Sequence, residues 1–344
     1  MRIVVDAMGS DNRPVPDVAG AVAAAREFSD TIILVGDQAR IEEQLRQHDT
    51  RGLSIEVVPA EQEVVMTDTP SVVARSKPRS SMHLGMNLVK AGQADAFVTC
   101  GNTGAALAIA TLRTLHRIPG VLRPALTTLL TIGGRRWILV DIGANADCKP
   151  EWLLQFAVMG SIYAERAMGL RAPRVALLSN GEEEGKGNLL IKDAAKLLEA
   201  SSLNYVGNVE PKEMLAGAAE VVVMDGFVGN ITIKSLEAMG DLLFKLIKAE
   251  LAGDLRSKLS GLLGRPAFRR VYRQVDPFEV GGAPLLGVNG VVIIGHGRST
   301  AVAVKNAVRQ ARQAVAGQII DAIREGVAAY QVSSQAEHFS AEEG

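Results

Sequence analysis

Five times along this chain, a short apolar run ends in a loop rich in glycine, asparagine and charged residues. The runs cover 97–100, 137–140, 175–179, 221–224 and 291–294, and the loops after them cover 101–105, 141–150, 180–188, 225–230 and 295–297. Each run has the length of a strand buried on both faces, and helical patterns follow most of the loops. The sequence therefore predicts a doubly wound, mostly parallel α/β sheet.

These loops are also where the chain is expected to bind a ligand. Ligands of such sheets sit beyond the carboxyl ends of the strands, so we expect the five loops to converge on one edge. Glycine lets the backbone approach a ligand closely, and a helix N-terminus presents unpaired N–H groups to an anion. The pattern indicates an enzyme with a site for a phosphate-like group.

The length and composition fit a large globular domain. With 344 residues, 47% of them hydrophobic, the chain can bury a sizeable core. We predict one large α/β domain over residues 1–332, with two lobes as the alternative, and a disordered tail over 333–344. Gly133 and Gly134 lie between two apolar runs and predict a tight hairpin turn, so part of the sheet is expected to be antiparallel.

The composition also narrows the partners and the compartment. Aromatic residues make up only 4% and the net charge is −1, which argues against nucleic-acid binding. No apolar run approaches the ~20 residues of a membrane span, and the N-terminus lacks the pattern of a secretory signal. Cys100 and Cys148 lack metal-ligand spacing, and we interpret them as reduced thiols that serve as small packing residues and not as nucleophiles. A cytoplasmic protein is expected.

The loop around Lys186 has only a superficial likeness to a nucleotide-binding P-loop. Its glycine spacing is one residue short, and no Ser or Thr follows the lysine to bind Mg²⁺. The dinucleotide fingerprint is missing after the first strand-like run. Of the five histidines, only His296, between two glycines at a strand end, is placed for chemistry. We predict neither a metal nor a cofactor.

Six motifs occur in order along the chain. They are VDAMGSD at 5–11, RSKPRSS at 75–81, GNTGA at 101–105, DIGANAD at 141–147, SNGEEEGKG at 179–187 and DGFVGN at 225–230. From residue 1 to about 330 the chain closely resembles the bacterial phosphate acyltransferases of the PlsX family. It departs from their usual pattern at Ser10, where a second glycine is common, and at Thr99-Cys100, where Ser-Ala is common.

The resemblance implies a reaction, a fold and a set of partners. Members of this family convert acyl-(acyl carrier protein) and inorganic phosphate to acyl phosphate, which feeds the first acylation of glycerol 3-phosphate in phospholipid synthesis. The implied fold is similar to that of the isocitrate/isopropylmalate dehydrogenases and the phosphotransacetylases. The implied partners are the acyl carrier protein, a second copy of the chain in a homodimer, and the membrane glycerol-3-phosphate acyltransferase that takes the product.

This chemistry needs few special groups. Phosphate is an ionised nucleophile and a thiolate leaves readily, so backbone donors, good positioning and one cation suffice. We predict Asn102, Asn145, Lys186 and His296 as catalytic residues. The predicted substrate-binding residues are Asp6, Gly9, Arg75, Lys77, Ser80, Ser81, Gly101, Thr103, Gly104, Asp141, Gly143, Asn180, Gly181, Gly187, Asp225, Gly226, Gly229 and Asn230.

Some of these residues have a plainer interpretation. The segment 75–81 equally fits a solvated polar turn, and a hydrogen-bonded structural role is the alternative for His296. The three glutamates at 182–184 would repel phosphate, so at least some of them must face away from it or brace Lys186.

Two other enzyme classes and one non-enzyme class stay open at this point. A phosphotransacetylase acting on short-chain acyl-coenzyme A is the nearest alternative. A metal-dependent decarboxylating dehydrogenase is less favoured, although several aspartates could supply Mg²⁺ ligands. These are Asp6, Asp11, Asp141, Asp147 and Asp225. A non-catalytic binding module fits the number of glycine-rich loops least well.

Residues 236–273 carry a different pattern, an apolar stripe at helical spacing beside many basic residues. We predict a projecting helical pair, with Pro266 ending its second helix. A basic amphipathic surface suits anionic lipid headgroups and an acidic carrier protein alike. The other interpretation is that the stripe belongs to the core and a dimer interface.

Overall fold

A computed structural model describes residues 1–275 and 277–342, without the side chains at positions 273, 275, 277, 278 and 331–342. Within this part the chain forms an 11-stranded sheet in the order β3-β2-β1-β4-β11-β10-β5-β6-β9-β7-β8. The strands are β1 (Arg2–Asp6), β2 (Thr31–Gly36), β3 (Ile55–Pro59), β4 (Ala96–Thr99), β5 (Ala125–Ile132), β6 (Arg135–Val140), β7 (Val175–Leu178), β8 (Tyr205–Val209), β9 (Val221–Val223), β10 (Ala283–Leu286) and β11 (Val291–Ile294).

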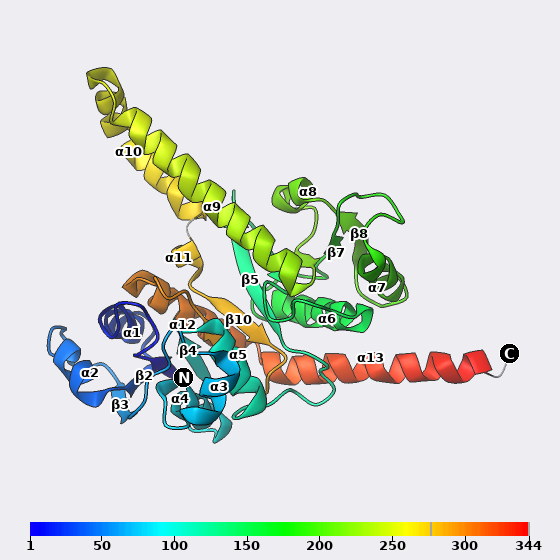
Figure 1. The fold of residues 1–344 in the computed structure, drawn as a ribbon, viewed down its shortest axis with the longest axis horizontal. Helices are drawn as coiled ribbons and strands as arrows, with labels where there is room; N and C mark the ends of the chain where they lie inside the picture. Colours follow the sequence, from blue (N-terminus) through cyan, green and yellow to red (C-terminus); the bar gives the residue numbers. More distant parts are fainter. Residues whose placement is uncertain (276, 343–344) are drawn as a thin grey trace.

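Helices cover both faces of this sheet (Figure 1). They are α1 (Val15–Phe28), α2 (Gln38–Leu45), α3 (Pro70–Ser76), α4 (Ser81–Lys90), α5 (Thr103–Leu112), α6 (Pro150–Arg166), α7 (Leu189–Glu199), α8 (Pro211–Ala216), α9 (Gly226–Leu251), α10 (Leu255–Val275), α11 (Pro277–Val280), α12 (Ala301–Ala316) and α13 (Ile319–Glu342). Most strand pairings are parallel. The predicted fold class is therefore confirmed.

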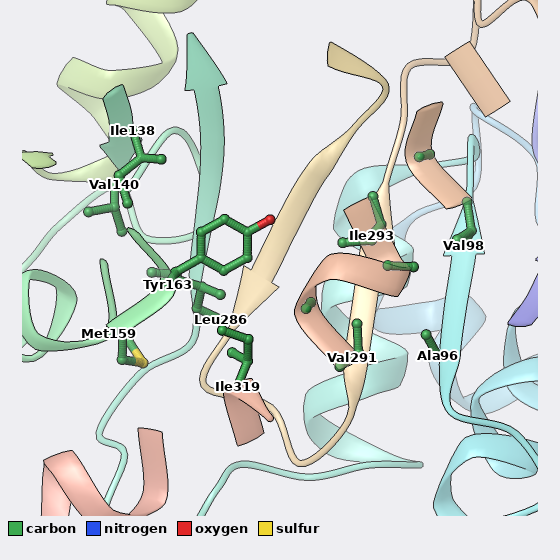
Figure 2. Close-up of a cluster of buried hydrophobic side chains, with 14 of the residues drawn as sticks. Ala96, Val98, Ile138, Val140, Met159, Tyr163, Leu286, Val291, Ile293 and Ile319 are labelled. Carbon is green, nitrogen blue, oxygen red and sulfur yellow. The ribbon is translucent and has the colours of Figure 1, made fainter. Parts of the chain in front are cut away.

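Successive side chains along a strand belong to two different hydrophobic cores, one on each face of the sheet. In β1, Ile3 and Val5 pack with α1 and α12 on one face, whereas Val4 packs with α3, α4 and α5 on the other. On this second face, α8 and α9 cover the part of the sheet built from β6, β7 and β9. The first core is continuous across the middle of the sheet. There, Tyr163 and Met159 of α6 lie beside residues of β6, β10 and β11 (Figure 2).

The direction of the strands reverses in the centre of the sheet. The pairings β11–β10, β10–β5 and β5–β6 are all antiparallel, so β6, β7 and β9 run opposite to β1, β4 and β11. The loops after β4 and β11 therefore lie at one edge, and those after β6, β7 and β9 lie at the other. The expectation that all five loops converge on one edge is wrong, because an apolar run carries no sign of its strand's direction.

The hairpin between β5 and β6 is confirmed. Gly133 and Gly134 have φ of 58° and 79°. Positive φ at both central residues gives a turn whose twist matches that of the two strands, and glycine adopts it without steric cost. Both glycines are exposed, with no neighbouring atoms where a Cβ would lie.

Helices α9 and α10 lie against each other and project from the body of the molecule (Figure 1). Phe244 of α9 meets Tyr272 of α10 edge-on, with ring centroids 4.8 Å apart. The prediction that Pro266 ends the second helix is wrong, since α10 continues through it to Val275. Proline removes one helical hydrogen bond, and the packing against α9 offsets that loss.

The C-terminal helical segment consists of two helices, α12 and α13. It is interrupted at Gly317 and Gln318, where Gln318 has φ of 51°. Helix α13 then continues to Glu342, through most of the segment for which the composition predicts disorder. Alanine, glutamine and glutamate are frequent there, and all three favour helix. Residues 343 and 344 lie outside the described residues.

Candidate functional site

The first group of loops follows β1, β4 and β11, and it is closely packed around Gly9. A Cβ on Gly9 would lie 2.9 Å from the backbone nitrogen of Cys100 and 3.0 Å from that of Gly101. Asp11 donates its backbone N–H to the carbonyl of Gly297 at 2.7 Å. The close approach of three loops explains why glycine is needed at position 9.

Buried polar contacts fix the geometry of this group. Thr99 donates its hydroxyl to Asp6 Oδ2 at 2.7 Å and accepts the N–H of Gly101 at 3.1 Å. Asp6 also accepts the N–H of Met8 at 3.0 Å. Burial raises the pKa of Asp6, and the hydrogen bonds from Thr99 and Met8 oppose that rise. Asp6 therefore positions the loops from inside and is too buried to touch a substrate.

Asn102 caps α5 and holds a strap formed by residues 63–69. Its Oδ1 accepts the N–H of Ala105 at 3.0 Å, and its Nδ2 donates to the carbonyls of Met66 and Asp68 at 3.1 and 3.0 Å. Its side-chain amide is thus used within the protein. In the described part of the chain, no hydrogen bond engages the backbone N–H groups of Thr103 and Gly104. They are the free donors at this helix N-terminus.

The predicted residues of the segment 75–81 have mostly structural contacts. Lys77 donates to Asp68 Oδ2 at 2.6 Å and to the carbonyl of Glu63 at 2.9 Å, so it braces the same strap. Ser80 caps α4 and lies 2.8 Å from His83 Nδ1. Ser80 and Ser81 are buried, whereas Arg75 is exposed.

His296 lies on the loop after β11 and faces α9. Its Nε2 is 3.6 Å from Glu237 Oε1, and half of its side chain is exposed. Arg298 lies 3.9 Å from the same carboxylate and 3.7 Å from Asp241. These contacts connect the first group of loops to α9, whose N-terminus belongs to the second group.

The second group of loops is organised by one carboxylate. Asp141, fully buried at the end of β6, accepts the N–H groups of Leu126, Gly143 and Ala144 on Oδ1 at 2.9–3.1 Å. Its Oδ2 accepts the backbone N–H of Asn145 at 2.7 Å and the side-chain Nδ2 of Asn145 at 2.9 Å. Burial raises the pKa of Asp141, and these hydrogen bonds to its charged form oppose the rise.

The N-terminus of α9 packs directly onto this loop. Asp225 caps the helix through the N–H of Val228 at 2.9 Å, and Gly226 donates its N–H to the carbonyl of Asn145 at 2.7 Å. A Cβ on Gly229 would lie 2.0 Å from the carbonyl oxygen of Asp141. Gly143, with φ of 146°, lies opposite the side chain of Asn230. Glycine here serves the close contact between helix and loop.

The third loop, after β7, carries Lys186 on its exposed surface. The stem of Lys186 packs against Gly181, and within the described residues no ion pair joins Lys186 to a carboxylate. Asn180 accepts the N–H of Gly187 at 3.1 Å and closes the loop. Glu182 faces Glu213 of α8, and their shared hydrogen bond raises the pKa of Glu182. That glutamate thus faces another carboxyl group and does not brace Lys186.

The comparisons with known proteins agree with this architecture. A family model described as "Fatty acid synthesis protein" matches residues 1–322. The phosphate acyltransferase of Syntrophotalea carbinolica is 46% identical over 319 residues, which is 93% of this chain and 92% of that protein. The phosphate acyltransferase of Trichlorobacter lovleyi is 46% identical over 90% of this chain and 89% of its own length. The chain belongs to the phosphate acyltransferase family. The resemblance carried by its six motifs is confirmed.

Solved structures support the fold of this phosphate acyltransferase chain. A phosphotransacetylase from Streptococcus pyogenes aligns with a TM-score of 0.59, covering 93% of this chain and 94% of its own, at 17% identity. The EutD phosphotransacetylase of Staphylococcus aureus gives 0.57 at 18% identity, with coverage of 91% and 94%. At such low identity these structures establish a shared fold.

Some residues that organise the phosphate acyltransferase loops were missed by the sequence reasoning. Glu237 contacts His296 from a helix that lies about 60 residues earlier in the chain, and Met66 belongs to the strap that Asn102 holds. Neither lies in a glycine-rich motif. Ser10 and Thr99, which depart from the family pattern, both donate to buried carboxylates. Burial raises the pKa of Cys100 to about 12, which agrees with its interpretation as a packing residue.

Asp17 gives this fold a pH dependence that can be tested. It is buried, it accepts the hydroxyl of Ser10 at 2.5 Å, and burial raises its pKa from 3.8 to about 7. Between about pH 4 and 7 the folded state holds a proton that the unfolded chain has released, so stability falls as the pH rises through this window. We expect Asp17→Asn, which cannot ionise, to gain about 2 kcal/mol relative to wild type between pH 5 and 8.

Urea denaturation at both pH values measures this difference. Asp147→Asn, which changes an exposed aspartate, is the matched control and should follow the wild type. If the wild type and Asp17→Asn lose stability in parallel, Asp17 is already ionised in the folded protein.

Proposed function

We propose that this chain transfers the acyl group of acyl-(acyl carrier protein) to inorganic phosphate, giving acyl phosphate and free carrier protein. The observation that carries the proposal is the family membership over nearly the full chain. The loop geometry supports it, because the free N–H groups of Thr103 and Gly104 lie at a helix N-terminus beside the Gly9 turn. Such a terminus suits an anion.

The reaction follows from few elements. A phosphate oxygen attacks the thioester carbonyl and forms a new carbon–oxygen bond, which gives a tetrahedral oxyanion. The oxyanion collapses to acyl phosphate as the carbon–sulfur bond breaks and the carrier's thiolate leaves. Each backbone donor aimed at the oxyanion stabilises it by about 3–4 kcal/mol. Asn102 and Asn145 act here as positioning residues, since their amides hold the strap at 63–69 and the Asp141 loop. His296 is held by Glu237 beside the first group of loops.

Lys186 is the residue we assign to phosphate charge at the second group of loops. Because the loops after β4 and β7 lie at opposite edges of the sheet, this assignment is an alternative to phosphate bound at Thr103 and Gly104, and a Lys186 variant decides between them. The ammonium group of Lys186 is exposed, and only its stem lies against Gly181. Loss of one charge-assisted contact weakens binding by about 1.5–3 kcal/mol. We therefore expect Lys186→Ala to raise the KM for phosphate roughly 10- to 100-fold without lowering the melting temperature. Lys192→Ala, on the exposed face of α7, is the control, and an equal KM for both variants contradicts the assignment.

The choice of acyl donor separates the proposal from its nearest alternative. Phosphorolysis is measured with long-chain acyl-(acyl carrier protein) and with acetyl-coenzyme A as donors. We expect turnover with the carrier-bound substrate and little with acetyl-coenzyme A. The reverse result favours a phosphotransacetylase, and metal-dependent NAD reduction favours a dehydrogenase.

The helical pair α9–α10 is the surface we assign to partners. Within the described residues no helix is long and apolar enough to cross a bilayer. The pair nevertheless leaves many large apolar side chains exposed, namely Met239, Leu242, Leu243, Leu246, Leu255, Leu259, Leu262 and Leu263. Exposed lysines and arginines accompany them at 245, 248, 256, 258, 265, 269 and 270, and the side chain of Arg273 lies outside the described residues. We propose that a second copy of the chain covers part of this stripe.

We further propose that the distal part of the pair touches an anionic membrane, where a membrane glycerol-3-phosphate acyltransferase takes up the product. Vesicle co-sedimentation tests this contact. The wild type should sediment with anionic vesicles at low salt and much less at high salt, because charges are screened over about 10 Å at 0.1 M. Leu259→Glu with Leu262→Glu should abolish sedimentation. Leu189→Glu, which changes an exposed leucine on α7, should not. If the protein with Leu259→Glu and Leu262→Glu sediments with the vesicles as well as the Leu189→Glu variant does, the membrane contact is contradicted.

A further inference from the structure

A cavity of about 580 Å³ lies at the amino-terminal ends of β6, β7 and β9. Arg135, Arg136 and Trp137 of β6 line it, together with Arg174 before β7 and Glu220 before β9. The catalytic loops of this part of the molecule follow the opposite ends of the same strands. Five residues separate Arg136 from Asp141, which is about 16 Å along a strand. The cavity is therefore distinct from the site at the carboxyl ends.

The lining of this cavity is basic. Arg174 is paired with Glu220 at 2.5 Å and also donates to the carbonyl of Gly217. Arg135 and Arg136 have no carboxylate partner among the described residues. Each donates one guanidinium nitrogen to a backbone carbonyl, that of Ala216 and that of Met168, respectively. Three guanidinium groups against one carboxylate leave a net charge of +2.

Both of these arginine side chains are held in place by a backbone carbonyl and, within the described part of the chain, still have N–H donors without an acceptor. A guanidinium group carries five N–H donors, and the carbonyl contact uses one nitrogen of each. The anchored side chains lose less conformational freedom when a ligand binds. The remaining N–H donors of each planar guanidinium group can pair with two oxygens of a phosphoryl group.

Trp137 belongs to the wall of this cavity and is itself almost fully buried, with 1% of its surface exposed. The indole therefore lies next to the place where a ligand would sit, and its emission can report on binding.

We propose that this cavity is a binding site for a small organic phosphate, separate from the acyl-transfer site. Its charge selects an anion, and its arginine pair selects a phosphoryl group. Its volume falls in the 300–1,000 Å³ typical of sites for organic ligands, so a bare phosphate ion would fill little of it. The site holds the phosphoryl group on Arg135 and Arg136, with the organic body against Leu170 and Ala219.

Trp137 itself provides the readout of binding. The chain has two tryptophans, so Trp152→Phe leaves Trp137 as the only one. In this background we titrate adenosine 5′-monophosphate, glucose 6-phosphate, pyrophosphate and inorganic phosphate, with adenosine and glucose as uncharged controls. We expect a saturable change in Trp137 emission with at least one organic phosphate, and none with adenosine or glucose. Comparing the responses to the nucleotide and to the sugar phosphate shows which of these two classes of organic phosphate binds.

Variants connect the signal to the cavity. Arg136→Gln keeps a donor for the Met168 carbonyl but loses the charge, and we expect it to weaken the affinity about 10-fold, as should Arg135→Gln. Arg171→Gln removes a charge from the exposed neighbouring loop and should change nothing. Lys186→Ala should also keep the Trp137 response, which separates this site from the catalytic one.

Two results overturn the proposal. In the first, none of the four phosphates gives a saturable change in Trp137 emission. In the second, Arg171→Gln weakens binding as much as Arg136→Gln, so that only general charge attracts the anion. Thermal melts of each variant establish that it is folded.

Discussion

Replacing Gly229 by alanine should lower kcat/KM for acyl transfer about 100-fold. The added Cβ would lie 2.0 Å from the carbonyl oxygen of Asp141 and 2.9 Å from the Cα of Ile142. Both are backbone atoms, so the start of α9 must move away from the loop by about 1 Å or more to restore an ordinary contact. A displacement of that size in a site built from positioned donors costs about two orders of magnitude in rate. Overpacking should also lower the free energy of unfolding by about 3 kcal/mol.

Steady-state kinetics and urea denaturation test both parts of this expectation. Gly240→Ala, on the same helix with no atoms within 4 Å of the new Cβ, is the control. It should keep full activity and gain about 0.5–1 kcal/mol of stability from the better helix former. Equal activity of the two variants would show that the contact between α9 and the Asp141 loop does not position the site.

Replacing Asp141 by alanine should lower the free energy of unfolding by about 3–5 kcal/mol. The buried carboxylate accepts five N–H contacts, from Leu126, Gly143, Ala144 and twice from Asn145. Without it, buried donors lose their partner, and each costs about 1–3 kcal/mol where water cannot reach it. Asp141→Asn should lower the free energy of unfolding by less, because the amide oxygen of asparagine still accepts hydrogen bonds.

Chemical denaturation of the two variants beside Asp147→Ala measures this effect. Asp147 lies on the same loop but is exposed, so its loss should change stability by less than about 0.5 kcal/mol. If Asp141→Ala is no less stable than Asp147→Ala, the loop is held mainly by its contact with α9.

Much of the fold follows from local sequence pattern. The apolar runs at 97–100, 221–224 and 291–294 are buried strands, because a strand covered on both faces needs apolar side chains at every position. Gly133 and Gly134 identify the hairpin for a similarly local reason, since few residues other than glycine adopt φ above zero. The helical pair was also recognisable, because its apolar spacing extends over 30 residues.

The candidate site is predictable only in part. The motifs around Gly9, Asn102 and Asp141 locate the loops, but not the partner of each polar side chain. The side-chain amides of Asn102 and Asn145 hydrogen-bond to the strap and to Asp141, respectively. The free donors are the backbone N–H groups of Thr103 and Gly104. An amide side chain bonds to whatever the fold brings within about 3 Å, and the sequence does not give that distance.

By itself the sequence determined the family, the fold class and the loops that carry polar residues. These rest on residue types at short spacing, which local steric and hydrophobic rules constrain. Only the tertiary structure decided that β6, β7 and β9 run opposite to β4 and β11, that Glu237 reaches His296, and that Arg135, Arg136 and Arg174 surround one cavity. Each of these depends on contacts between segments far apart in the chain. Their free energy is gained only when the whole sheet is assembled.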